Sequence, residues 1–157
     1  MKKGELFTAF PVCVKERSVR QVSFWGNYPH TLDSKNRLFI PAKFREGLGD
    51  SFVLYAPKND NCLYAYNVKD WEDICAEVIE SGNLNMQRYI FDDAVAVEPD
   101  KQGRITIKAD FCKRAGLKKE ITVAGVGKRI EIWDAQKRAE AMARAEALSE
   151  SYPEIHF

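Results

Sequence analysis

The sequence contains one motif twice, and this internal repeat constrains the fold more than any other feature. Residues 32–44 and 99–111 align at an offset of 67 positions and share Asp, Arg, Ala and Phe at matching places. The match continues through two further pairs of segments: 52–54 with 121–123, after a slip of two positions, and 62–66 with 129–133. The chain is therefore a tandem duplication of a unit of about 45 residues.

Each copy is expected to contain the same elements in the same order. A short strand leads into the shared Asp-x-x-x-Arg motif, and alternating apolar residues after it predict a half-buried strand. One or two helical turns follow, and they end at Gly49 in the first copy and Gly116 in the second. The predicted helical turns span 41–48 and 109–115, and the later strands span 51–56, 62–66, 120–125 and 129–133.

Helical periodicity follows each copy. An apolar stripe in residues 70–79 predicts a helix, a second short helix is expected at 86–91, and residues 135–148 predict an Ala-rich charged helix. The stripe consists of Trp71, Ile74, Cys75, Val78 and Ile79. The predicted organisation is a flexible N-terminal arm (1–24), a first repeat (27–74), a helical linker (75–93), a second repeat (94–137), and a C-terminal helix and tail (138–157).

The composition and the short strands together predict an α+β fold. Apolar residues make up 45% of the chain and the net charge is +1, which is typical of a folded globular protein. Four short strands cannot bury both of their faces alone. We therefore expect the two copies to interleave into one small barrel, with short helices over its open ends.

The repeated Asp-x-x-x-Arg turn carries the clearest functional signal. An aspartate that opens a turn can accept hydrogen bonds from backbone N–H groups two residues later. The fourth positions, Asn36 and Gly103, are the residue types that best tolerate a positive φ. This pattern predicts a type I turn followed by a left-handed residue. It does not explain Arg37 and Arg104, since no turn requires arginine after its tip.

Positive charge gathers around both turns. The net charge of +1 excludes a basic field over the whole molecule, so nucleic-acid binding would need local patches. Residues 33–45 and 100–114 each carry a local charge of +3. Two interpretations remain open: each arginine forms a weak surface ion pair on a solvated charged face, or each aspartate braces a guanidinium that contacts an anionic partner.

The sequence lacks the residue patterns that other classes of function require. The cysteines (Cys13, Cys62, Cys75 and Cys112) are far apart and there are two histidines, so we expect no metal site, no cofactor and no catalytic constellation. We also expect no signal peptide, and no run approaches the roughly 18 apolar residues that a membrane span needs. A small-molecule substrate is not expected either.

The segment from His30 to Arg45, together with 100–105 and 126–134, closely resembles the MraZ family. The resemblance covers roughly residues 25–137 and includes both copies and their spacing. It implies a tandem duplicated swapped-hairpin fold, an AbrB-like double-split β-barrel with short covering helices. Two positions depart from the family pattern: Asn36 replaces the usual Gly, and Lys108 replaces the Pro that Pro41 supplies in the first copy, so the second helix could begin differently.

The resemblance also implies a function. It indicates a cytoplasmic, nucleoid-associated transcriptional regulator that forms homo-oligomeric rings and binds repeated double-stranded DNA boxes upstream of the division and cell-wall gene cluster, its own gene included. An AbrB-like protein–protein assembly module, an antidote or scaffold, is the alternative. The candidate DNA-binding residues are Asp33, Lys35, Arg37, Lys43, Arg45, Asp100, Lys101, Arg104 and Lys108.

Overall fold

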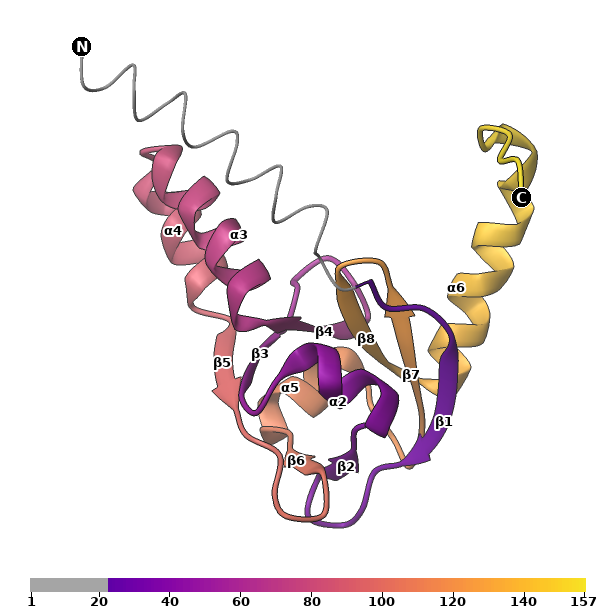
Figure 1. Cartoon of the computed structure of the whole chain (residues 1–157), viewed down its shortest axis with the longest axis horizontal. Coiled ribbons are helices and arrows are strands. Elements are labelled where there is room, and N and C mark those ends of the chain that lie inside the picture. The colour runs from indigo at the N-terminus through magenta and orange to yellow at the C-terminus, as the bar shows by residue number, and fades with distance from the viewer. Residues whose placement is uncertain (1–22) are drawn as a thin grey trace.

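The computed structural model describes residues 23–157, so the predicted arm at 1–24 lies outside the described residues except for its last two positions. The elements are β1 (Asn27–Thr31), β2 (Arg37–Phe39), α2 (Ala42–Leu48), β3 (Phe52–Tyr55), β4 (Cys62–Asn67), α3 (Val68–Glu80), α4 (Leu84–Phe91), β5 (Ala94–Val97), β6 (Arg104–Thr106), α5 (Ala109–Ala115), β7 (Glu120–Val126), β8 (Arg129–Asp134), α6 (Ala135–Ala147) and a 3₁₀ turn, η1 (Ser149–Ser151). Both copies supply strand, strand, helix, strand, strand in that order (Figure 1). The predicted α+β fold with a duplicated unit is confirmed.

The strands of the two copies are interleaved in one antiparallel sheet. Its order is β1-β7-β8-β4-β3-β5, with β4 and β8 paired at the centre. The first strand of each copy lies at an edge: β1 pairs with β7 of the other copy, and β5 pairs with β3 of the other copy. This exchange is the swapped arrangement expected for AbrB-like modules. Because β1 and β5 are edges in the described chain, the hydrogen-bonded ladder does not close into a complete barrel.

The remaining strands, β2 and β6, form a separate two-stranded antiparallel ribbon. It lies at the bottom of the molecule in Figure 1, where the two turns also lie. Leu38 and Ile105 face each other across the ribbon and are completely buried. The ribbon therefore turns one face toward the core and leaves the other face outside.

The core is built from matching residues of the two copies. Phe44 and Phe111, from α2 and α5, are 1% and 2% exposed and pack with the inward residues of the sheet and ribbon. The buried pairs at the repeat offset are Leu38 with Ile105, Ile40 with Ile107, and Phe44 with Phe111. Since aliphatic and aromatic side chains contribute about 1.5–3 kcal/mol each when they are buried, these pairs tie each copy to the other.

The two short helices begin in the same way, although one follows proline and the other lysine. Pro41 has φ −50° and ψ 134°, and Lys108 has φ −53° and ψ 140°. Lys108 adopts the backbone conformation that proline enforces, so the expected change in the second helix start does not occur. The helices end at the glycines that the sequence indicated, Gly49 and Gly116, both with positive φ.

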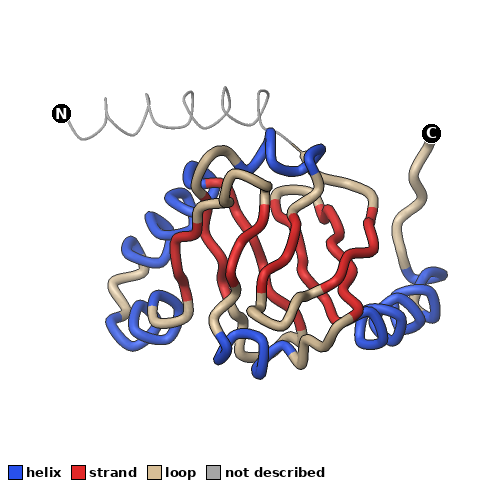
Figure 2. The backbone as a smooth tube through the Cα atoms, turned by 90° about the horizontal axis from the view of Figure 1, so that it is seen from below, coloured by secondary structure: helices blue, strands red, loops and turns tan. Residues whose placement is uncertain are grey.

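The longer helices lie outside the strand layers. The α3–α4 pair extends from one side and α6 from the other (Figures 1 and 2). Helix α3 begins at Asn67, whose side chain accepts a hydrogen bond from the Asp70 amide. The predicted stripe on α3 is correct for Val78, which is 4% exposed, but Ile79 is 56% exposed. Ile79 lies about 100° from Val78 around the helix, beyond the face that packs. Among the described residues, none of the helices combines the length and the apolar character that a membrane-spanning segment needs.

Candidate nucleic-acid interface

The two Asp-x-x-x-Arg turns have the same hydrogen bonds. Asp33 Oδ1 accepts from the backbone N–H groups of Lys35 (2.9 Å) and Arg37 (2.8 Å). Asp100 Oδ1 accepts from the equivalent groups, Gln102 N (2.9 Å) and Arg104 N (3.0 Å). These bonds hold the backbone of each turn in one shape, as the sequence predicted.

A left-handed residue completes each turn. Asn36 has φ 59° and is the one non-glycine residue with positive φ in the described chain, and Gly103 has φ 82°. The amide of Asn36 donates to the Asp33 carbonyl at 3.0 Å, and the amide of Gly103 donates to the Asp100 carbonyl at 2.9 Å. The predicted type I turn with a left-handed fourth position is therefore confirmed in both copies.

Each aspartate also holds its arginine by a single nitrogen. Arg37 Nε donates to Asp33 Oδ2 at 2.7 Å, and Arg104 Nε donates to Asp100 Oδ2 at 2.9 Å. Within the described residues, the Nη atoms of these two arginines make no hydrogen bond or ion pair. Because phosphate and base edges are recognised by the N–H groups of guanidinium, each turn presents an oriented cation with its terminal donors available.

The same bonds keep the two carboxyl groups ionised. The backbone N–H of Arg37 holds the pKa of Asp33 below its usual range, and the Arg37 side chain adds to this effect. The backbone N–H of Arg104 lowers the pKa of Asp100 in the same way. Exposed ion pairs of this kind contribute little to stability, so their main consequence is the orientation of the arginines.

The β2–β6 ribbon places the two turns side by side. Ile40 N donates to the Gly103 carbonyl at 3.0 Å, and Ile107 N donates to the Asn36 carbonyl at 2.8 Å. These two bonds occupy equivalent positions in the repeat, and each connects one copy to the other. Arg37 lies opposite Thr106. Arg104 therefore occupies the diagonal position, where Cα atoms are roughly 7–8 Å apart. The structure thus brings both arginines onto one outward face.

The other predicted basic residues divide into two groups. Lys35 and Lys101 are exposed in the turns, beside the arginines. Lys43 and Lys108 lie on or next to the short helices and contact aromatic rings: Lys43 Nζ is 5.1 Å from the Trp25 centroid, and Lys108 Nζ is 4.8 Å from the Phe111 centroid. Cation–π contacts at exposed sites are worth about 0.5–1 kcal/mol, which is small enough to be exchanged for a phosphate.

Arg45 has a structural contact that the sequence did not indicate. A Cβ atom on Gly103 would lie 2.6 Å from Arg45 Nη1, so the guanidinium of the first copy lies directly on the turn of the second. Its Nε is buried and has no hydrogen-bond partner in the described chain. Arg45 therefore supports the Gly103 turn by packing. The charge pattern of the sequence instead predicts an exposed cation at this position.

A buried ion-pair cluster accounts for part of the charge in the second patch. Asp93, whose side chain is 8% exposed, binds Lys58 and accepts a 2.9 Å hydrogen bond from Arg114 Nη1. Arg114 Nη2 also donates to the Ala56 carbonyl at 3.2 Å. Arg114 thus joins α5 to the loop after β3. A buried charge is costly without a partner, so Arg114 serves the structure rather than the charged surface.

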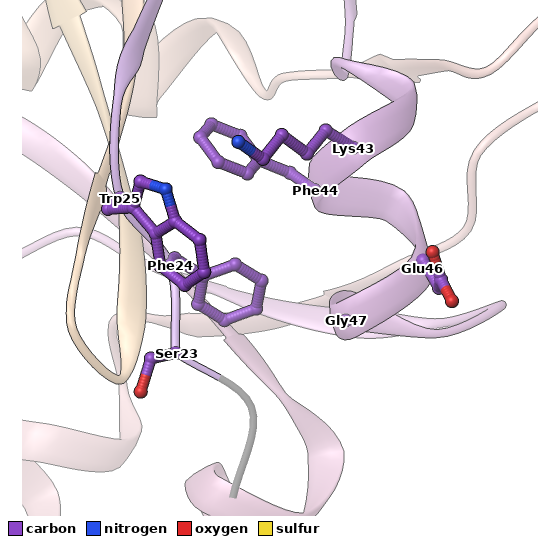
Figure 3. A pocket seen from close by; sticks show the side chains of 7 residues that line it. All are labelled: Ser23, Phe24, Trp25, Lys43, Phe44, Glu46 and Gly47. Carbon is purple, nitrogen blue, oxygen red and sulfur yellow. The ribbon is translucent and has the colours of Figure 1, made fainter.

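Two further clusters lie away from the turns. A cavity of about 390 Å³ lies between the residues before β1 and helix α2 (Figure 3), and its lining is Ser23, Phe24, Trp25, Lys43, Phe44, Glu46 and Gly47. Asp60, Cys62 and Glu131 bring their polar atoms within 4.8 Å of one another. Their carboxylates already have protein partners, because Glu131 accepts from Arg129 and Trp133 and Asp60 accepts from Tyr64. Burial raises the pKa of Cys62, so its thiol is protonated at neutral pH.

Comparison with known proteins identifies relatives for most of the chain. A family described as "MraZ protein, putative antitoxin-like" matches twice, at residues 23–87 and 90–154. A protein of Acetivibrio thermocellus named transcriptional regulator MraZ is 41% identical over 119 residues, covering 73% of this chain and 82% of the relative. A relative of the same name from Pelotomaculum thermopropionicum is 44% identical, covering 70% of this chain and 79% of the relative. Another, from Natranaerobius thermophilus, is 35% identical and covers 83% of this chain and 94% of the relative.

The two family matches agree with the duplicated fold and its repeated turns. The two family matches fall on the two copies, and both contain one Asp-x-x-x-Arg turn with its left-handed residue. The identity exceeds 30% over more than two thirds of both chains. On the interleaved fold, the repeated turns and these relatives together, this chain belongs to the MraZ family.

Proposed function

We propose that this chain is a DNA-binding transcriptional regulator whose β2–β6 ribbon and braced arginines contact duplex DNA. The observation that carries the proposal is the pairing of Arg37 and Arg104 on one outward face, each held through Nε with its Nη donors available. A two-stranded ribbon is narrow enough to enter the major groove. The relatives named transcriptional regulator MraZ support the same function.

The target that we propose follows from the family resemblance. It is a set of short repeated boxes upstream of the division and cell-wall gene cluster, including the gene of this chain, so that the protein acts in the cytoplasm on the nucleoid. Lys35 and Lys101 would add phosphate contacts beside the arginines, while Asp33 and Asp100 would orient them. Lys43 and Lys108 would reach phosphates only after leaving their aromatic rings.

We also propose that the protein acts as a homo-oligomer, arranged as a ring. One protomer offers a single small ribbon, and linked copies raise the affinity for repeated boxes through effective concentration. Apolar side chains exposed on the outer helices provide surface for contacts between protomers, namely Ile79, Leu84, Met86, Tyr89, Met142 and Leu148. These helices extend from opposite sides of the strand layers (Figure 1), so a head-to-tail contact could close a ring.

The test is binding of the DNA upstream of its own gene, measured by fluorescence anisotropy over a series of salt concentrations. The Arg37→Ala/Arg104→Ala variant should bind this DNA far more weakly than the parent. The slope of log K against log salt should become shallower by about 0.9 for each phosphate that the variant no longer neutralises. Arg88→Ala/Arg144→Ala is the control for charge, because it removes the same charge from α4 and α6. Light scattering must show that it assembles like the parent, since both helices belong to the proposed surface between protomers.

The two proposed classes give different results in this experiment. If the ribbon binds DNA, the turn variant is weak and the control variant binds like the parent. Equal affinity of parent and turn variant would show that the basic turns are a solvated face. Failure of the parent to bind this DNA above its affinity for unrelated duplex would favour the protein–protein assembly module.

A further inference from the structure

The outward face of the β2–β6 ribbon contains an exposed aromatic side chain that the arginines do not explain. Side chains alternate along a strand, so Leu38 faces the core and its neighbours face outward. Phe39 is 47% exposed, whereas Leu38 and Ile40 are 0% and 2% exposed. Its ring centroid lies 5.9 Å from the Arg104 guanidinium carbon, directly across the ribbon. Phe39 therefore lies within the proposed DNA-contacting face.

The second copy shows that the fold does not need an aromatic residue here. Thr106 occupies the position equivalent to Phe39, in a strand with the same burial pattern. Both residues point outward from the same ribbon, and both copies form the same turn. Because threonine is sufficient at this place in β6, the phenylalanine in β2 calls for a reason other than packing.

We propose that Phe39 is a specificity-determining residue that packs against the C5-methyl group of a thymine in the major groove. This inference rests on the proposed DNA-binding function. The thymine methyl is exposed only in the major groove, and phenylalanine is among the side chains that contact it. Arg104, held beside the ring, contacts the adjacent base edge or phosphate. The two copies then present different surfaces, apolar at Phe39 and hydroxylic at Thr106.

The test uses two forms of one duplex, the DNA upstream of the gene, with either thymine or deoxyuridine. Deoxyuridine removes only the C5-methyl group and keeps base pairing. The parent should bind the uracil duplex about fourfold more weakly for each methyl that Phe39 covers, which corresponds to the roughly 0.8 kcal/mol of one buried methyl group. Phe39→Ser, which has no methyl group to contact the thymine, should bind both duplexes equally and keep the salt dependence of the parent, since no charge changes.

Two further variants keep the test decisive. Phe39→Leu retains an apolar side chain and should still prefer the thymine duplex. Val126→Thr is the matched control, because Val126 is also a strand residue that is 47% exposed, at the far end of β7. It should discriminate like the parent. A thermal midpoint for Phe39→Ser near that of the parent shows that the ribbon is intact, as the small hydroxyl side chain of Thr106 at the equivalent position leads us to expect.

The outcomes separate this inference from the function on which it rests. If the parent binds both duplexes equally while Arg37→Ala/Arg104→Ala is weak, the ribbon binds DNA but Phe39 does not read thymine. If Phe39→Ser keeps the parent's preference for thymine, another residue makes the methyl contact. If the parent does not bind this DNA specifically, the proposed function fails and the inference with it.

Discussion

Replacement of Gly103 by valine tests the link between turn geometry and DNA binding. Gly103 has φ +82°, a region that β-branched residues rarely adopt. Backbone strain of this kind costs about 1–3 kcal/mol. The new Cβ would also meet the Arg45 guanidinium at 2.6 Å, but this flexible end can move at little cost. We therefore expect Gly103→Val to reduce the free energy of unfolding by about 2 kcal/mol, chiefly through the backbone.

Two measurements test this value. For a chain of this size the thermal midpoint falls by about 2–4 °C for each kcal/mol, so the expected decrease is roughly 4–8 °C. The strain can also be relieved by rotation of the turn, which would move Arg104 away from Asp100. Affinity for the upstream DNA should then fall although no charge has been removed.

Gly103→Asn is the matched control. Asparagine already occupies the equivalent position at Asn36, with φ 59°, and its side chain would displace Arg45 as valine does. A decrease in stability well below that of valine would assign the effect to the backbone. Equal thermal midpoints and equal DNA affinities for Gly103→Val and the parent would show that neither folding nor binding depends on a left-handed residue at this position.

Two predictions concern the helix start and the carboxylates. Lys108→Pro should raise stability by about 0.4–1 kcal/mol, because Lys108 already has φ −53° and proline restricts the unfolded chain; a lower midpoint in thermal unfolding would contradict this. The lowered pKa values of Asp33 and Asp100 mean that their contribution to stability is complete above the usual value near 3.9 and disappears as the pH falls through the folded pKa. An NMR titration should find both midpoints below about 3.9, and midpoints at or above that value would show that the turns do not hold their carboxylates.

Local features of the fold could be predicted from the sequence because they depend on neighbouring residues. The Asp-x-x-x-Arg motif specifies its own turn, and a positive φ at Asn36 and Gly103 follows from residue type. The alternation around Leu38 and Ile105 indicated the buried face of the ribbon. The same alternation could have shown that Phe39 points outward beside the arginines.

Contacts between distant segments could not be predicted in this way. Periodicity shows that β1 and β5 are strands, but it does not say that each pairs with the other copy. The local charge of the two patches included Arg45 and Arg114 as surface cations. In the structure, Arg45 packs on Gly103 and Arg114 binds the buried Asp93. The fold brings each of these arginines against a segment that is distant in the sequence.

Hydrogen–deuterium exchange of the full chain, with and without the DNA upstream of its gene, can locate the binding surface without any substitution. Binding through the ribbon should protect peptides that cover residues 33–39 and 100–106, and this protection should be absent in Arg37→Ala/Arg104→Ala. Backbone amides of α6, which lies away from the ribbon (Figure 1), should exchange at the same rate in both states. Protection confined to the outer helices, with the two turns unchanged, would contradict binding through the ribbon.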